Sequence, residues 1–488
     1  MPSLLFEQGQ SGRGSDFVAD RGRAEDFLDP KFLRAGLPLP DLAEIEVARH
    51  FTSLSQRNFS VDTNFYPLGS CTMKYNPKLN EAVAAFAGFT DLHPFAPDEG
   101  AQGALALLWH MERSLTSLFG MHAFSLMPAA GAHGEITAML MAKRYFAAKN
   151  QPERDTCIVP DTAHGTNPAS AAMVGYRVMS IPSTARGRTD MKALKAALNS
   201  RIAVCMMTNP NTLGLFEDEI TEMTGAVHDC GGLMYYDGAN ANAIVGLCRP
   251  GDMGFDLLHL NLHKTFSVPH GGGGPGSGPV GANTGLAPYL PKPTVGRRRD
   301  GTFFLDADMP DSIGPVRGFW THFLAVVRAY AYVIVHGADG LKRNSQLAVL
   351  NANYLRAKVK DLLAVPYSDF CRHEFVCSAE ALKRETGVRA LDIAKGLLDA
   401  GVHAPTMYWP HVVPECLMIE PTETETRDVL DAFVESLRSL VQQSRSDPQS
   451  MARLPLHTPV RRVDEARVGR LANKGIGLRW WPDGQGTD

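Results

Sequence analysis

The most regular feature of the chain is a series of short apolar runs with helical patterns between them. The runs comprise residues 156–159, 176–181, 203–207, 233–236 and 255–262. They lack the clean alternation of apolar and polar residues that marks a strand with one face in water. Apolar strands that follow one another through helices form parallel sheets covered on both faces. The pattern therefore predicts an α/β domain with a mainly parallel sheet.

Helical periodicity predicts the elements around this sheet. A helix is expected over residues 99–119, with Asp98 as its cap and Gly120 at its end. Aspartate can accept hydrogen bonds from the free N–H groups of a first turn, and glycine adopts the left-handed conformation that ends many helices. Further helices are expected at residues 134–149, 318–336 and 341–363.

The C-terminal part shows a different order of elements. Strands are predicted at residues 374–379 and 416–420, and helices at residues 390–400 and 426–443, an arrangement typical of a small α+β domain. Residues 1–80 contain several prolines and read poorly as regular structure. We therefore expect an N-terminal arm (1–80), a large α/β domain (81–337), a small α+β domain (338–443) and a C-terminal arm (444–488).

Composition and charge narrow the class of protein. Of the 488 residues 44% are hydrophobic and 20% charged, as in ordinary globular proteins. The net charge of -4 gives no reason to expect nucleic acid or an anionic membrane as a partner. No apolar run has the ~20 residues that span a bilayer, and the N-terminus has no signal core, so we expect a cytoplasmic protein. The eight scattered cysteines predict buried thiols and no metal site.

The candidate chemistry is centred on Lys264, which closely follows the apolar run 255–262. Lysine is seldom buried, because removing its ammonium group from water is costly. A lysine at the end of a buried strand therefore suggests an amine that reacts, most clearly as a Schiff base with an aldehyde cofactor. The glycine run 271–274 does not make a nucleotide-binding P-loop, in which the lysine follows the glycines.

Three other features precede this lysine along the predicted sheet. His164 follows the run 156–159 and can stack on a planar ring, and Asp237 follows the run 233–236 at the sheet edge where ligands bind in α/β proteins. Ala239 is small enough to lie under a flat cofactor. A loop of small residues opens a predicted helix and suits a phosphate; it consists of Ala130, Gly131, Ala132 and His133. Each feature alone also fits an ordinary turn, loop or helix cap.

In chain order these features give a phosphate loop, a stacking histidine, a carboxylate and a Schiff-base lysine. The set fits pyridoxal 5'-phosphate better than other cofactors, since Asp237 would keep the pyridine nitrogen protonated while Lys264 binds the aldehyde. A G-x-G-x-x-G fingerprint at the first helix is absent. The sequence thus predicts a pyridoxal phosphate enzyme with Lys264, His164 and Asp237 as catalytic residues.

Four segments of the chain resemble the glycine cleavage system P-protein family, the glycine decarboxylases. They are residues 66–77, 163–170, 208–214 and the lysine segment 261–266 with 270–276. The resemblance runs from about residue 58 to residue 420, which is most of the chain. The chain is similar to the lysine-bearing, C-terminal half of the family's long form, and so to the β-type chain (subunit 2) of its two-subunit form.

The resemblance implies the type I fold of pyridoxal phosphate enzymes and an assembly with subunit 1, as α2β2. It implies decarboxylation of glycine with release of CO2 and transfer of the aminomethyl group to the lipoyl group of H-protein. By position Lys264, His164, Asp237, Ala239 and the loop from Ala130 to His133 take the cofactor-binding roles. His263 belongs with them, and Thr208 or Asn209 would reach the ring hydroxyl.

Two other interpretations stay open at this point. Another pyridoxal phosphate enzyme, such as an aminotransferase or a serine hydroxymethyltransferase, would use the same features. An inactive relative that serves only as a scaffold is the second, although intact Lys264 and Asp237 argue against it. The residues that bind the glycine carboxylate and move protons are not identified. Candidates for the first role are Arg297, Arg298, Arg299 and Arg317, and for the second His263 and His270.

Overall fold

The computed structural model describes residues 5–8, 26–33, 39–93, 95–270, 276–319 and 321–464. The chain divides into two compact units, one of residues 1–60 with 455–488 and one of residues 61–454. The described part of the smaller unit contains helix α1 (Glu44–Ser55) and the 3-10 helices η1 (Leu5–Glu7) and η3 (Pro30–Phe32). Within the described residues, no helix has both the length and the apolar character needed to cross a membrane.

Helix α1 corrects the expectation that residues 1–80 lack regular structure. Glu44 and Glu46 stand in its first turn, where the helix dipole favours negative charge. The Glu46 carboxylate also accepts a hydrogen bond from the Ala43 N–H at 2.9 Å. No proline interrupts this stretch, since the nearest ones are Pro40 and Pro67. The predicted arms also include residues 1–4, 9–25, 34–38 and 465–488, which lie outside the described residues.

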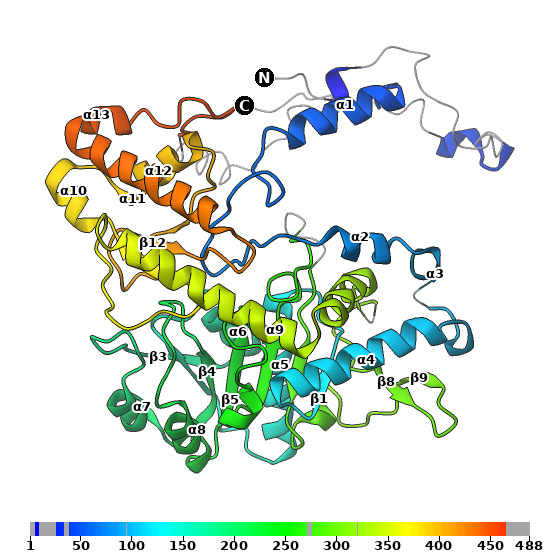
Figure 1. Cartoon of the computed structure of the whole chain (residues 1–488). Coiled ribbons are helices and arrows are strands. Elements are labelled where there is room, and N and C mark those ends of the chain that lie inside the picture. Colours follow the sequence, from blue (N-terminus) through cyan, green and yellow to red (C-terminus); the bar gives the residue numbers. More distant parts are fainter. Residues whose placement is uncertain are drawn as a thin grey trace. The chain divides into compact units, whose positions relative to one another are not determined.

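The larger unit is built around a seven-stranded sheet with the order β1-β7-β6-β5-β4-β2-β3 (Figure 1). Its strands are β1 (Ala123–Ser125), β2 (Thr156–Pro160), β3 (Arg177–Ile181), β4 (Ile202–Thr208), β5 (Leu233–Gly238), β6 (Leu257–Leu260) and β7 (Val280–Ala282). Strands β2 to β6 are parallel, whereas β7 is antiparallel to both its neighbours. The five predicted strands are confirmed. The sequence pattern missed β1 and β7, because a strand of three residues is too short to show a recognisable apolar run.

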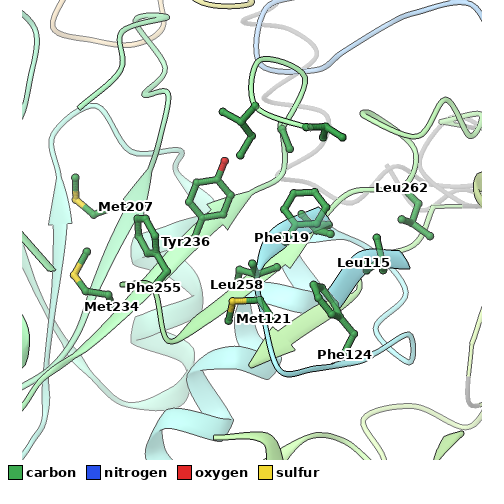
Figure 2. Packing of buried hydrophobic residues seen from close by; sticks show 14 of the residues in the cluster. Leu115, Phe119, Met121, Phe124, Met207, Met234, Tyr236, Phe255, Leu258 and Leu262 are labelled. Carbon is green, nitrogen blue, oxygen red and sulfur yellow. The ribbon is translucent and has the colours of Figure 1, made fainter. Parts of the chain in front are cut away.

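Successive residues of the central strands point into two separate apolar cores. On β5, Met234 and Tyr236 join one core, and Leu233 and Tyr235 join the other. The first core is covered by α4 (Gln102–Phe119), α7 (Met191–Ala197), α8 (Ile220–Asp229) and the start of α9 (Phe323–Val359). The second is covered by α5 (Gly131–Ala148) and α6 (Thr166–Val174). Figure 2 shows part of the first core. Burial on both faces explains why the runs are apolar throughout.

Helix α4 begins later than the sequence predicts. Asp98 lies in the 3-10 turn η4 (Asp98–Gly100), and the residue at the N-cap position is Ala101. The carbonyl of Asp98 accepts a hydrogen bond from the Gln102 side chain at 2.7 Å, and its carboxylate accepts one from the Leu305 N–H at 3.4 Å. The role of Asp98 as a cap is therefore wrong, because a separate turn uses its oxygens. The end at Gly120 is confirmed, with a φ of 70°.

A three-stranded antiparallel sheet, in the order β10-β12-β11, follows in the chain. Its elements are β10 (Phe375–Ser378), β11 (Thr406–Met407), β12 (Cys416–Ile419), α10 (Glu380–Thr386), α11 (Ala390–Asp399), α12 (Arg427–Ser446) and α13 (Pro448–Met451). Helix α9 places Tyr332 in the first core and Leu355 in the core under this second sheet. Gly337 interrupts the helix with φ 59° and ψ -173°. The domain boundary at residue 337 stays a prediction.

The remaining described elements are short. They are α2 (Lys78–Ala84), α3 (Ala87–Thr90), η5 (Pro250–Met253), η6 (Ala287–Tyr289) and the hairpin of β8 (Thr294–Arg297) with β9 (Phe303–Asp306).

Residues 67–76, which we call the strap, join the two sheets. Leu68 forms a β-bridge with Ile419, and the Gly69 N–H donates to the carbonyl of Met418 at 3.3 Å. Farther along the strap, the buried Lys74 Nζ donates to the Glu423 carboxylate and to the carbonyl of Thr265, both at 2.7 Å. Burial alone would lower the pKa of Lys74, but the charge of Glu423, the neighbouring Tyr332 and the hydrogen bonds to both groups together outweigh burial and raise that pKa. The strap is thus fixed by an ion pair removed from water.

We expect Lys74→Met to lower the free energy of unfolding by about 3–5 kcal/mol, because it leaves the buried Glu423 charge without its partner. Urea unfolding of the variant and of Lys74→Met/Glu423→Gln checks this, since the double variant should recover part of the loss. Lys78→Met is the matched control: Lys78 pairs with Asp62 in water, and its loss should cost about 1 kcal/mol or less. Equal effects of Lys74→Met and Lys78→Met would contradict the account.

Candidate functional site

A cavity of about 250 Å³ opens at the carboxyl ends of the parallel strands. It is lined by Ser70, Ala130, Gly131, Ala132, Glu135, His164, Thr166, Thr208, Pro210, Thr212, Asp237, Ala239, Asn240, Asn261, His263, Lys264, His373 and Glu374. The loops after β2, β4, β5 and β6 all contribute, because the carboxyl ends of parallel strands meet at one edge of a sheet. The strap and the residues before β10 complete the wall.

Nine of the residues predicted from the sequence line this cavity. They are Ala130, Gly131, Ala132, His164, Thr208, Asp237, Ala239, His263 and Lys264. Two others, His133 and Asn209, do not. Of the two candidates for the ring hydroxyl, Thr208 is therefore the one at the cavity. The glycine run 271–274 lies outside the described residues.

Lys264 lies just beyond β6 and is 9% exposed. Its Nζ donates a hydrogen bond to the carbonyl of Ser70 in the strap at 2.5 Å. Ser70 has a φ of 61°, an uncommon conformation for a residue with a side chain. The amine is thus held at the cavity wall by a backbone carbonyl and not by a carboxylate.

Asp237, near the end of β5, is held in place by several neighbours. Its Oδ2 accepts a hydrogen bond from Asn167 Nδ2 at 3.0 Å, and its Oδ1 accepts one from the Ala239 N–H at 2.9 Å. His259 Nε2 lies 3.6 Å from Oδ1, and the hydroxyl of Tyr235 is hydrogen-bonded to His259 Nδ1. Burial lowers the pKa of His259 to about 4, so this ring is neutral near pH 7. These neighbours orient the carboxylate without neutralising its charge.

The start of α5 forms another wall. The N–H groups in the first turn of a helix have no partner within the helix. Here no side chain caps them at Ala130 either. The backbone at Gly131 lies close to the buried Asn261, since a Cβ there would come within 2.3 Å of the Asn261 Oδ1 atom and would displace that side chain. The His133 side chain stabilises this loop by hydrogen bonds. Its Nδ1 accepts from the Ala129 N–H at 3.1 Å, and its Nε2 lies 3.1 Å from the carbonyl of Val316. These bonds explain why His133 does not line the cavity.

The histidines at the cavity carry little positive charge near neutral pH. Burial lowers the pKa of His164, whose Nδ1 is hydrogen-bonded to the Thr166 hydroxyl at 2.7 Å. Burial, His270 and Lys264 together lower the pKa of His263 to about 3. The ring of His270 contacts that of His263 edge-on, at 5.1 Å between centroids. His164 similarly contacts Trp409, at 5.5 Å.

The structure adds buried acids that the sequence analysis missed. Glu135 accepts hydrogen bonds from the hydroxyls of Thr166 at 2.8 Å and Ser170 at 3.1 Å. Burial and the charge of Asp237 raise the pKa of Glu135 to about 8. The sequence signal that could have identified Glu135 is its place on the apolar face of α5, one turn after Gly131. Glu374 gave a similar signal, as an acid that opens the apolar run of β10.

Other predicted groups lie elsewhere. Asn209 is buried, and its Oδ1 accepts from the Glu217 N–H at 3.0 Å. Thr208 Oγ1, at the cavity, is buried without a hydrogen-bond partner in the part of the chain that the structure describes. None of the candidate arginines lines the cavity; Arg297, for example, lies over the ring of Trp109 at 5.6 Å. Among the described lining residues, Lys264 is the single lysine and there is no arginine.

Comparisons with known proteins agree along the whole chain. The family profile described as "Glycine cleavage system P-protein" matches residues 28–302, and that described as "Glycine dehydrogenase, C-terminal domain" matches residues 344–453. A "Probable glycine dehydrogenase (decarboxylating) subunit 2" of Caldanaerobacter subterraneus subsp. tengcongensis is 52% identical over 98% of both chains. The protein of the same description from Kosmotoga olearia is 50% identical over 99% of this chain and all of its own.

Solved structures support the fold. A crystal structure of glycine decarboxylase (P-protein) of the glycine cleavage system, in inhibitor-bound form, has a TM-score of 0.71 at 21% identity and covers 85% of this chain and 94% of its own. A sphingosine-1-phosphate lyase of Burkholderia pseudomallei has a TM-score of 0.60 at 14% identity, over 90% of this chain and 97% of its own. The predicted type I fold and the resemblance noted in the sequence are confirmed, and the chain belongs to the glycine cleavage system P-protein family.

Proposed function

We propose that this chain is the cofactor-bearing subunit 2 of a glycine dehydrogenase (decarboxylating). It binds pyridoxal 5'-phosphate in the cavity, decarboxylates glycine with release of CO2, and transfers the aminomethyl group to the lipoyl group of H-protein. The observation that carries the proposal is the meeting of the Lys264 amine, the Asp237 carboxylate and the uncapped start of α5 at one cavity. Two relatives that match almost end to end are described as subunit 2 of a glycine dehydrogenase (decarboxylating), which supports glycine as the substrate over other amino acids.

The residues present fit the cofactor. The first turn of α5 offers free N–H groups to a phosphate, Asp237 offers a carboxylate to a pyridine nitrogen, and Lys264 offers an amine to an aldehyde. The unpartnered Thr208 Oγ1 fits a ring hydroxyl. Bound pyridoxal phosphate supplies a ring that accepts the electron pair left when a bond to the α-carbon of glycine breaks.

The chain's own side chains have separate tasks in this reaction. Asp237 holds a proton on the ring nitrogen, and Asn167, the Ala239 N–H and His259 keep its carboxylate aimed at the cavity. Lys264 fixes the cofactor and yields it to the amine of glycine. His164 and Ala239 border the space for the ring. Asp237 and Lys264 are buried at the cavity, whereas Ala130, Ala132 and His164 are exposed and leave it open to solvent.

The charge of the cavity supports the need for a partner. Cofactor phosphate and substrate carboxylate are both anions, but the described lining offers a single lysine, Lys264, and no arginine, and it also contains the Asp237 carboxylate. We propose that subunit 1, in an α2β2 assembly, supplies cationic groups at the site. Docking of lipoylated H-protein belongs to the same assembly. The eight free thiols suit a reducing compartment, for which we propose the cytoplasm.

Exchange of labelled bicarbonate into the carboxyl group of glycine tests the function. With subunit 1 and lipoylated H-protein present, we expect exchange by the wild-type chain and none by Lys264→Ala, which lacks the amine that holds the cofactor. Lys195→Ala is the control, since Lys195 forms an exposed pair with Glu222 and should exchange at the wild-type rate. Exchange by Lys264→Ala at the wild-type level would contradict the proposal.

The role of Asp237 is tested by Asp237→Asn, which keeps the shape and removes the charge. We expect the variant to retain the visible absorbance of the lysine-bound cofactor while its rate of exchange falls by about 10²–10³-fold, as when one preorganised electrostatic contact is lost. Stopped-flow or steady-state exchange assays on the holoenzyme provide the rates. A variant with normal absorbance and a normal rate would show that the ring needs no carboxylate at its nitrogen.

A further inference from the structure

A second cluster of buried ionisable groups lies at the wall of the cavity. Glu374, Glu420 and His373 have nitrogen or oxygen atoms within 4.8 Å of one another, and none of these residues is more than 2% exposed. Their positions follow from the second sheet: Glu374 immediately precedes β10, Glu420 immediately follows β12, and Phe375 pairs with Ile419 in antiparallel register. The sheet therefore brings two carboxyl groups side by side. We call Glu374 and Glu420 the acid pair.

The two members of the acid pair have unequal surroundings. Glu420 Oε1 accepts hydrogen bonds from the Thr72 hydroxyl at 2.6 Å and from Asn242 Nδ2 at 3.0 Å, and Asn240 Nδ2 donates to Oε2 at 2.9 Å. Glu374 accepts one hydrogen bond, from the Ser70 N–H at 2.7 Å. Donors stabilise the ionised form of a carboxyl group, and two adjacent buried carboxylates repel each other. Burial raises the pKa of both carboxyl groups, but its three donors make Glu420 the member that ionises more readily and Glu374 the member that takes a proton.

Ser70 of the strap contacts both the Glu374 carboxyl group and the amine of Lys264. The carbonyl of Ser70 accepts a hydrogen bond from Lys264 Nζ, and the N–H of the same residue donates to Glu374 Oε2. Lys264 and Glu374 also line the same cavity. The backbone here has little freedom, because a Cβ at Gly69 would come within 2.2 Å of Met418 Cγ on β12. Amine and carboxyl are thus held on two sides of one fixed residue.

We propose that Glu374 carries the proton that Lys264 gains and loses, and that the charge of Glu420 keeps the proton affinity of Glu374 high. This step rests on the proposed function and assigns to it a proton donor and acceptor. When an incoming amine displaces Nζ, Nζ loses its bond to the cofactor and gains the proton of Glu374, whose O–H electron pair stays on the carboxylate. The proton that the incoming amine gives up then restores the O–H bond of Glu374, and the same transfers run in reverse when Nζ attaches again. No oxidant or further reactant is needed.

The charges around Glu374 agree with this role. Burial first, and then the charge of Glu420, raise the pKa of Glu374 well above its usual value, while the Ser70 N–H and Lys264 lower it. The other titratable groups near it are neutral near pH 7, since burial lowers the pKa of His373 to about 3 and raises that of Cys371 and that of Cys416 to about 12. The proton on Glu374 is thus governed mainly by burial, Glu420 and Lys264.

Infrared spectroscopy of the full-length chain without cofactor tests the protonation directly. At neutral pH we expect the wild-type spectrum minus that of Glu374→Gln to show the C=O band of a protonated carboxyl group. The band should disappear as the pH rises through the pKa of Glu374, and Glu420→Gln should move that loss to lower pH by removing the like charge. A difference spectrum without this band, or one that Glu420→Gln leaves unshifted, would overturn the proposal.

The rate at which methylamine displaces Lys264 from pyridoxal phosphate, followed by absorbance, tests the transfer. Glu374→Gln should slow this displacement by about 10²–10⁴-fold and flatten its pH profile, while cofactor affinity stays normal. Glu112→Gln is the matched control: Glu112 is buried on α4 away from the cavity, and burial raises its pKa to about 8. It should lose its own infrared band and react at the wild-type rate. A normal rate and pH profile for Glu374→Gln would refute the transfer.

A metal ion is the other possible occupant of this cluster of ionisable groups. Titration of the cofactor-free chain with Mg²⁺, Mn²⁺ and Zn²⁺ tests whether the cluster binds one. A cation bound tightly by the wild type and not by Glu374→Gln would overturn the proposal in favour of a metal site at His373, Glu374 and Glu420. The spectroscopic and methylamine measurements use neither glycine nor subunit 1. Their failure is therefore distinct from a failure of glycine decarboxylation, which the exchange assay reports.

Discussion

The burial of the Lys264 amine at the end of β6 is the constraint on which the site depends. An amine so far removed from water needs a partner, and it finds the Ser70 carbonyl of the strap. The strap is in turn held by pairing with β12 and by the buried Lys74–Glu423 ion pair. Lys74 also binds the carbonyl of Thr265, next to Lys264. The reactive amine and the segment that covers it are therefore fixed by the same set of contacts.

The sheet supplies the other half of the site. Parallel strands buried on both faces leave their polar residues at the carboxyl edge, where Asp237 and Lys264 come together from β5 and from the loop after β6. Behind them, Asn167, His259 and Tyr235 hold Asp237 in place with neutral groups. Lys264 is the single lysine of the described lining, which holds no arginine. That shortage of positive charge is the physical reason to propose cationic groups on a second subunit.

Much of this arrangement could be predicted from the sequence, because local patterns encode it. Apolar runs located the parallel strands, and residues that follow four of the five runs proved to line one cavity. What failed was non-local. Glu374 opens an apolar run in the sequence, but its place at the cavity depends on a contact with Ser70, which is 304 positions away in the chain. His133 was placed with the cavity because it lies in the right loop, yet its side chain hydrogen-bonds to Ala129 and lies against Val316 instead.

The proposed chemistry depends on Lys264 as the residue that carries the cofactor. Borohydride reduction of the chain loaded with pyridoxal phosphate, followed by proteolysis and mass spectrometry of the peptides, tests it most directly. We predict a single modified peptide, with the pyridoxyl group on Lys264. Modification of another lysine with Lys264 unmodified, or stoichiometric cofactor binding that borohydride does not fix to any lysine, would contradict the account.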